Sequence, residues 1–183
     1  LSTDQIDVEN GSRYGIRYFD ESNTPHHPII LHNSPSGAIE RVVYALLEKA
    51  ALDQKEGRKA QLPLWLAPIQ VRIIPLKDEF LSHCENLADR LSSQEIRVDI
   101  DDRNETLGKR IRESETEWIR YTLVIGEKEV SKLNLSIRDR KTGESKELSF
   151  DDFVNEIKNQ TKDKPFTKLN LARLVSKRPQ IMV

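Results

Sequence analysis

A histidine, a glycine and an arginine lie close together in the stretch PIILHNSPSGAIER (28–41), where an apolar run gives way to an amphipathic one. The apolar run ends at His32, and Arg41 falls in the first turn of the expected helix. Gly37 has no side chain, so a flat nucleotide base could approach the backbone there. Arg41 would offer such a ligand a fixed charge with forked donors. A solvent-exposed arginine and a structural histidine are the simpler interpretations of the pattern alone, and they stay open.

A strand and a helix would hold these residues. Residues 13–20 and 28–33 have the composition of strands. From residue 36 an amphipathic helix is predicted, with Ser34 or Ser36 able to cap its first turn. Arg41 lies on the far side of this helix from its apolar stripe, which should face a core. The stripe consists of Ile39, Val42, Val43, Leu46, Leu47 and Ala50.

A second region begins after the polar segment DQKEGRKAQLP (53–63), which carries a glycine and ends in a proline, as a joint between domains would. Beyond it, strands and helices alternate. This order predicts an α/β fold with a largely parallel or mixed sheet covered by helices. The expected elements are strands over 69–76, 96–101 and 121–126, helices over 78–92 and 105–117, a hairpin over 133–150 and a last helix after it.

Composition limits the classes of function. The net charge is −1 and 32% of residues are charged, so any nucleic-acid binding must come from a local patch. No apolar stretch reaches the length needed to span a bilayer. The single cysteine, Cys84, cannot form an internal disulfide, and its helical context predicts a buried, inert thiol. These features are typical of a cytoplasmic protein.

Several motifs in the same order resemble threonyl-tRNA synthetases, which are class II aminoacyl-tRNA synthetases. PIILHNSPSGAIER resembles their motif 3, and STDQIDVENGSRYGI (2–16) resembles their active-site strand. DDRNETLGKRIRESE (101–115) and LVIGEKEV (123–130) resemble motifs of their anticodon-binding domain, and LPLWLAPIQVRIIPL resembles its beginning. SPSGAIER and LVSKRPQ are closer to the archaeal branch.

The resemblance implies three parts. Residues 1–60 would be the C-terminal piece of a class II antiparallel catalytic sheet with the motif 3 helix. Residues 61–164 would be an α/β anticodon-binding domain with a mixed sheet flanked by helices, and residues 165–183 a basic C-terminal tail.

Five residues match the nucleotide site of that family. Arg41 matches the catalytic arginine, which binds ATP (used with Mg²⁺) and the aminoacyl-adenylate, and Glu40 matches its companion acid. Thr3 matches a position near the adenosine, and Gln5 one near the substrate hydroxyl. Gly37 completes the ATP and adenylate site by admitting the base.

The resemblance also implies a zinc ligand and a threonine-binding residue at His32, nine residues before Arg41. The family's Zn²⁺ is held by one Cys and two His, and its open position can take the amino group and the hydroxyl of threonine. No other Cys or His lies at ligand spacing. We therefore expect that the chain alone cannot assemble the metal site and is inactive in catalysis.

Three residues match those that contact the anticodon in the family: Asn104, Glu129 and Arg138. Single-stranded RNA is read by hydrogen bonds and stacking, which need few charges. A further family arginine is replaced by Trp118, which could stack on a base or belong to the core. The tail over 162–178 has six basic residues and one acid, and either contact with the RNA backbone or a solvated tail fits this composition.

The resemblance thus implies an ATP-dependent threonine–tRNA ligase, with threonine, ATP and tRNA-Thr as partners, no membrane, and a homodimer in the full-length enzyme. Two alternatives stay open. One is a non-catalytic RNA-binding module, although such a module needs neither GAIER nor a zinc-spaced histidine. The other is a ligase for proline or glycine, against which His32 and Gln5 argue together.

Overall fold

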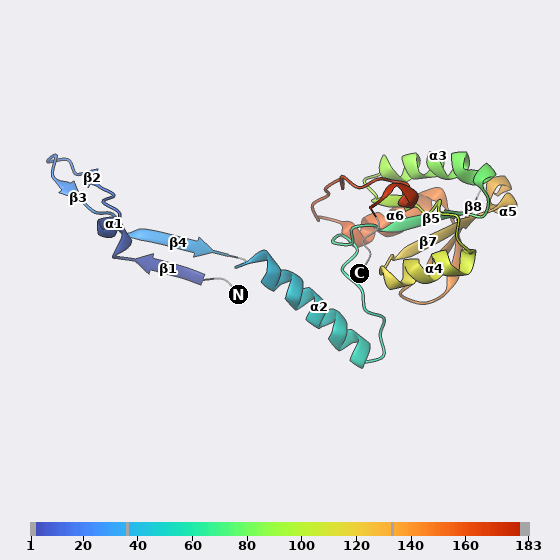
Figure 1. The fold of residues 1–183 in the computed structure, drawn as a ribbon, viewed down its shortest axis with the longest axis horizontal. Coiled ribbons are helices and arrows are strands. Elements are labelled where there is room, and N and C mark those ends of the chain that lie inside the picture. Colours follow the sequence, from blue (N-terminus) through green and yellow to red (C-terminus); the bar gives the residue numbers. More distant parts are fainter. Residues whose placement is uncertain (1–2, 36, 133, 180–183) are drawn as a thin grey trace. The chain divides into compact units, whose positions relative to one another are not determined.

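The computed structural model describes residues 3–35, 37–132 and 134–179, so Ser36, one of the two predicted helix caps, lies outside the described residues, as does the start of the predicted hairpin at 133. The chain forms two compact units, Leu1–Ala51 and Leu52–Val183. Figure 1 shows the elements of each unit.

The first unit is built on two small antiparallel pairs. Strand β1 (Thr3–Asp7) pairs with β4 (Ile30–Ser34), and β2 (Tyr18–Phe19) pairs with β3 (Pro25–His26). Helix α1 (Asn10–Arg13) lies between β1 and β2. The strand predicted over 13–20 is therefore wrong except at its last residues. Gly15 takes a φ of +68°, which ends α1 in a turn and prevents an extended backbone there.

Helix α2 (Ile39–Lys55) confirms the predicted helix but not its buried stripe. Among its described residues only Ala50 is buried. Ile39 is 79% exposed, and Val43 and Leu47 are 48% and 49% exposed. An apolar stripe of this width normally packs against a core, and the described residues of the chain do not cover it.

The second unit contains a five-stranded mixed sheet in the order β6-β5-β7-β8-β9. The first three strands in this order are parallel, and β8 and β9 continue the sheet antiparallel. All the strands predicted for this second unit are present, which confirms the α/β fold class. They are β5 (Val71–Pro75), β6 (Val98–Ile100), β7 (Tyr121–Ile125), β8 (Asn134–Asp139) and β9 (Ser145–Ser149).

Helices cover both faces of this sheet, and Figure 1 shows α3 (Leu81–Ser92) and α4 (Leu107–Thr116) on opposite sides. The short helix η1 (Asp78–Phe80) precedes α3. Together with α6 (Phe150–Thr161), α3 buries the apolar core. Thr106 accepts a hydrogen bond from the Lys109 amide and so caps α4. The predicted helices are thus confirmed, and the side chains of Thr106 and Ser149 cap the beginnings of α4 and α6.

The predicted inert thiol and the absence of a membrane-spanning pattern both have structural counterparts. Cys84 on α3 is fully buried, and burial raises the pKa of its thiol to about 12. A thiol with this pKa stays protonated at neutral pH and is a poor nucleophile. Within the described parts of the chain, no helix combines the length and apolar character that a membrane crossing requires.

The chain after α6 packs against the edge strand β6. The Ile100 amide donates to the Arg173 carbonyl at 2.9 Å, and Ile100 and Leu174 form an isolated parallel bridge. The short helix η2 (Val175–Lys177) follows. This segment covers one edge of the sheet, which would otherwise offer unpaired backbone groups.

Candidate functional site

The register of β1 and β4 gathers three of the predicted site residues. Gln5 lies opposite His32, and Thr3 lies opposite Ser34. Side chains alternate between the two faces of a strand, so Thr3, Gln5 and His32 share one face, together with Asp7. Apart from Ile30, which lies opposite Asp7, this face is polar, and it is largely exposed.

His32 has one acidic neighbour on this face. Its Nε2 lies 3.7 Å from Asp7 Oδ2. The backbone and side-chain amides of Asn10 and the Glu9 amide donate to Asp7, and these bonds, with His32 nearby, hold the pKa of Asp7 below its usual range. Across residues 3–35, 37–132 and 134–179 there is no group of three or more metal-ligating side chains. A zinc site at His32 would therefore need ligands that the described residues do not supply.

The opposite face of the same strand pair is apolar at its centre. Ile6 and Leu31 are paired across the strands and are 71% and 74% exposed. At the end of this face Asn33 donates to Asp4. An isolated pair of strands is only marginally stable, and an uncovered apolar face normally contacts other residues. Strands with one polar and one apolar face are therefore typical of a larger sheet.

The remaining nucleotide-site candidates lie at the start of α2. Gly37 has a φ of +67°, a left-handed conformation that glycine adopts without strain. Glu40 and Arg41 are exposed in the first turn of α2. Arg41 has no ion-pair partner among the described residues, so its guanidinium remains available to an anionic ligand.

In the second unit, two predicted RNA contacts follow parallel strands. Asn104 is exposed in the loop between β6 and α4. Glu129 is half-buried on α5 (Glu127–Ser131), which follows β7. Because β6, β5 and β7 are parallel, both residues lie at the carboxyl edge of these strands. Glu129 Oε2 also accepts the Gly126 amide at 3.1 Å and so caps α5.

Arg138 lies elsewhere on the sheet. It stands opposite Thr122, near the beginning of β7, because β8 runs antiparallel to β7. Its Nε donates to Glu115 Oε1 of α4 at 3.2 Å. The structure therefore places Arg138 on the side covered by α4, set back along the strands from Asn104 and Glu129.

Glu115 is not among the site residues predicted from the sequence, yet it joins several basic side chains. Its carboxylate also lies 3.3 Å from Lys59 Nζ and 3.6 Å from Arg140 Nε. These partners are distant in sequence from Glu115, so no local pattern in the sequence could have identified them.

Trp118 is neither fully exposed, as a residue that stacks on a base would be, nor fully buried, as a core residue would be. It is half-buried, and its φ of +59° is unusual for a bulky side chain. It follows α4, where the Ile119 amide closes the helix on the Ser114 carbonyl at 3.0 Å. Trp118 lines a cavity of about 190 Å³ with Arg120 and Arg140, so one part of the side chain remains accessible.

Comparison with known proteins finds relatives over the whole chain and a matching family model for most of the second unit. Residues 70–160 match the family model of the anticodon binding domain. The whole chain is 70% identical to a threonine–tRNA ligase of Nitrosopumilus maritimus and covers 30% of it. Over 98% of the chain, the identity to a threonine–tRNA ligase of Pyrococcus horikoshii is 48%, covering 29% of that protein.

A solved structure has a similar fold. It is the RNA binding domain of threonyl-tRNA synthetase from Cryptosporidium parvum, with a TM-score of 0.61 and 25% identity, over 87% of this chain and 38% of that one. The chain spans about three tenths of the length of the curated relatives that it matches. It is therefore homologous along its whole length to part of the threonine–tRNA ligases, and its residues 70–160 match the anticodon binding domain of that family.

Proposed function

We propose that this chain acts as part of an ATP-dependent threonine–tRNA ligase of the cytoplasm, a homodimer in full length. Such an enzyme joins threonine and ATP into threonyl-adenylate, releases pyrophosphate and transfers threonine to tRNA-Thr. The first unit would contribute to the active site, and the second would bind the anticodon. The observation that carries the proposal is 70% identity to a threonine–tRNA ligase along the entire chain.

The geometry of the first unit supports a role in substrate binding. Gln5 and His32 are direct neighbours across β1 and β4, so both can reach one ligand on the polar face. Thr3 lies on the same face and would contact the adenosine. His32 would be one zinc ligand of the full-length enzyme, where Zn²⁺ would hold the amino group and hydroxyl of threonine.

Arg41 would act by charge rather than by proton transfer. A guanidinium stays protonated at all physiological pH values, so it can bind the ATP phosphates, which carry Mg²⁺, and then the adenylate. Gly37 leaves room for the base, and Glu40 would accept a hydrogen bond from the nucleotide.

Mutation of Arg41 tests this role. In a full-length ligase carrying this segment, Arg41→Ala should lower threonine-dependent pyrophosphate exchange about 100-fold or more, as loss of a fixed charge at a reacting centre does. Arg17→Ala, which removes another exposed arginine of the same unit, is the control. Equal activities of the two variants would contradict the proposal.

A second candidate function is a non-catalytic RNA-binding module. The observation in its favour is that the second unit has its own apolar core and needs no other unit to bury it. The Arg41 experiment separates the two, because a pure RNA binder has no exchange activity to lose.

A further inference from the structure

We propose that the C-terminal segment Arg173–Arg178 positions the loop that carries Asn104 and thereby controls RNA recognition. The inference rests on the proposed role of Asn104 in reading the anticodon. It assigns to this segment a geometric function in addition to any attraction of its basic residues for the RNA backbone.

The main anchor is a two-point contact between Ser176 and Asp102. The Ser176 amide donates to Asp102 Oδ1 at 2.9 Å, and the Ser176 hydroxyl donates to Asp102 Oδ2 at 2.5 Å. One serine therefore satisfies both oxygens of a carboxylate two residues before Asn104. Hydrogen bonds to charged groups are stronger than those between neutral groups, so this contact fixes the direction of the loop.

Two further contacts hold the segment against β6, directly before the loop. Arg178 Nη1 lies 2.9 Å from Asp99 Oδ2, whose side chain is fully buried. The Ile100 amide donates to the Arg173 carbonyl at 2.9 Å. The segment is thus fixed to the same strand from which the loop emerges.

The other side of the loop is held by α4. Arg103 donates to both oxygens of Asp101 at 2.8 and 2.7 Å and also reaches Glu113 at 2.6 Å. Arg110 Nη1 donates to the Asp101 carbonyl at 3.0 Å. Asp101 and Arg103 are thus bound toward α4, while Asp102 is bound toward the C-terminal segment.

Asn104 follows Asp101, Asp102 and Arg103, whose side chains all have partners, but its own side chain is unbound among the described residues. It is exposed, and its side chain makes no hydrogen bond within the described parts of the chain. A free amide on a loop that is fixed from two sides is preorganised to bind, because little conformational entropy is lost on binding.

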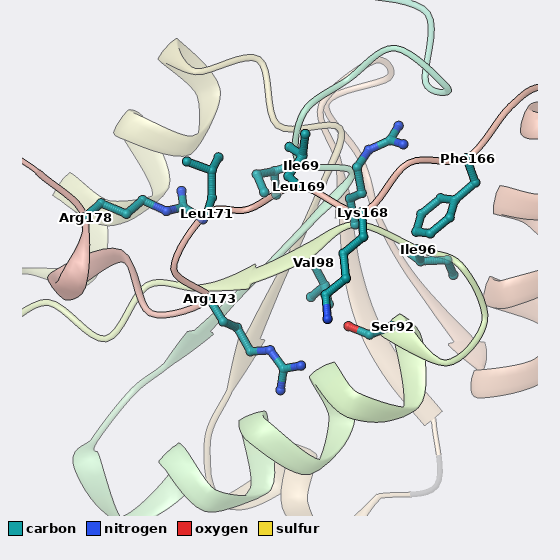
Figure 2. A pocket seen from close by; sticks show the side chains of 11 residues that line it. Ile69, Ser92, Ile96, Val98, Phe166, Lys168, Leu169, Leu171, Arg173 and Arg178 are labelled. Atoms are coloured by element: carbon teal, nitrogen blue, oxygen red, sulfur yellow. The ribbon is translucent and has the colours of Figure 1, made fainter.

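The preceding part of the tail makes a looser contact. Between it and the sheet edge lies a cavity of about 290 Å³, and Figure 2 shows Phe166 and Leu169 of the tail and Ile96 and Val98 of the sheet edge around it. The hold on the Asn104 loop therefore depends on the last contacts, at residues 173–178. Two basic residues there, Arg173 and Arg178, already pair with Asp89 and Asp99.

The test measures binding of the 183-residue chain to a tRNA-Thr transcript and to the same transcript with a substituted anticodon. Ser176→Ala removes only the hydroxyl contact and should weaken cognate binding about 3- to 10-fold, within the effect of one charge-assisted hydrogen bond. Binding of the substituted transcript should not change, and Ser176→Thr should restore the cognate affinity. Thr167→Ala, which removes an exposed hydroxyl of the tail outside the loop contacts, is the matched control and should leave the binding of both transcripts unchanged.

A double-mutant cycle shows whether Ser176 acts through Asn104. In an Asn104→Ala background, Ser176→Ala should have no further effect on cognate binding. An additive loss, equal weakening of both transcripts, or no loss in the single variant would overturn the inference. If Asn104→Ala itself leaves cognate binding unchanged, both the proposed anticodon role of Asn104 and this inference are wrong.

Discussion

Glu129 illustrates how one side chain can serve both the fold and recognition. Its Oε2 accepts the Gly126 amide at 3.1 Å, which leaves the other carboxylate oxygen for a base amino group. Loss of the whole side chain therefore removes a helix cap as well as the proposed base contact.

Two substitutions separate these effects. Glu129→Ala should lower the free energy of unfolding by about 0.5 to 2 kcal/mol, the usual cost of a lost cap, and should also weaken cognate tRNA binding. Glu129→Gln can still accept the Gly126 amide, so it should keep the stability and lose discrimination between anticodons, by about 1 to 3 kcal/mol. Urea denaturation and tRNA titration of both variants measure the two quantities. If Glu129→Gln discriminates as well as the original chain, Glu129 is not a base reader.

Arg138 should act more generally on RNA. Its ion pair with Glu115 is partly exposed, with 41% and 27% of the two side chains accessible. Such pairs contribute at most about 1 kcal/mol to stability, so Arg138→Ala should leave the melting temperature nearly unchanged. It should weaken binding of both tRNA transcripts and lower the slope of log K against log salt by about 1. An unchanged slope, like that of the exposed-residue control Arg112→Ala, would remove Arg138 from the RNA contacts.

His32 can be tested by metal content. In a full-length ligase carrying this segment, His32→Ala should lower bound zinc and threonine activation together, because a three-ligand site loses one ligand. His27 is a suitable control, since it is exposed in the same unit and its Nδ1 lies 2.7 Å from the Ile16 carbonyl oxygen. Full zinc occupancy in His32→Ala would show that His32 has a structural role.

A buried arginine on the α4 side of the sheet joins two strands to the end of α4 through ion pairs. Arg72 donates from Nε and Nη2 to the two oxygens of Asp99 at 2.9 and 2.8 Å, and both side chains are fully buried. Glu117, which directly follows the C-terminal end of α4, lies 2.7 Å from the same guanidinium. These charges tie β5, β6 and the end of α4 together.

The carboxylate of Asp101 should make this arrangement sensitive to acid. Burial alone would raise the pKa of Asp101, but the hydrogen bonds and charge of Arg103 outweigh it and hold the pKa below 3.8. A lowered folded-state pKa gives a stabilisation that is complete above pH 3.8 and is lost as the pH falls through the folded-state value.

Asp101→Asn should therefore lower stability at pH 7 by about 1 to 3 kcal/mol, because it weakens a charge-assisted bond. The difference from the original chain should shrink as the pH falls below 3.8. Denaturant unfolding at several pH values measures this, and Glu85→Gln, an exposed change on α3, is the control. A difference that stays constant with pH would contradict the assigned cause.

The sequence predicted the elements better than their contacts. Short, largely apolar runs located β5 and β7 to within two residues, because strands buried on both faces have this local signature. The pairing of Asp102 with Ser176 joins residues 74 positions apart, so no local pattern contains it. The predicted strand over 13–20 failed at Gly15, where the backbone conformation overrides the apolar composition. In the site, the resemblance selected Gln5 and His32, but only the strand register shows that they are neighbours.

At the scale of the whole molecule, the two units differ in how much apolar surface they bury. The second unit has a continuous core, whereas the first exposes Ile6, Leu31 and the apolar stripe of α2. Exposed apolar surface of this extent is typical of a surface that contacts another protein segment. The chain matches only 30% of the length of its relative, so segments of that relative outside the match are candidates for this contact.

The isolated 183-residue chain should consequently show no threonine-dependent pyrophosphate exchange. The described residues supply at most one of the three expected zinc ligands, and the polar face of β1 and β4 is open. A sensitive exchange assay with purified chain, with a full-length threonine–tRNA ligase as the positive control, measures this. Exchange above the background would mean that these residues form a complete active site.

The second unit of this chain is proposed to read the threonine anticodon. The most direct measurement is the dissociation constant of the purified chain for tRNA-Thr and for the same RNA with a substituted anticodon, at one salt concentration. Base-edge contacts typically discriminate by about 1 to 3 kcal/mol each, so we expect cognate binding that is tighter by about tenfold or more. Equal affinity for the two RNAs, or no binding of either, would contradict it.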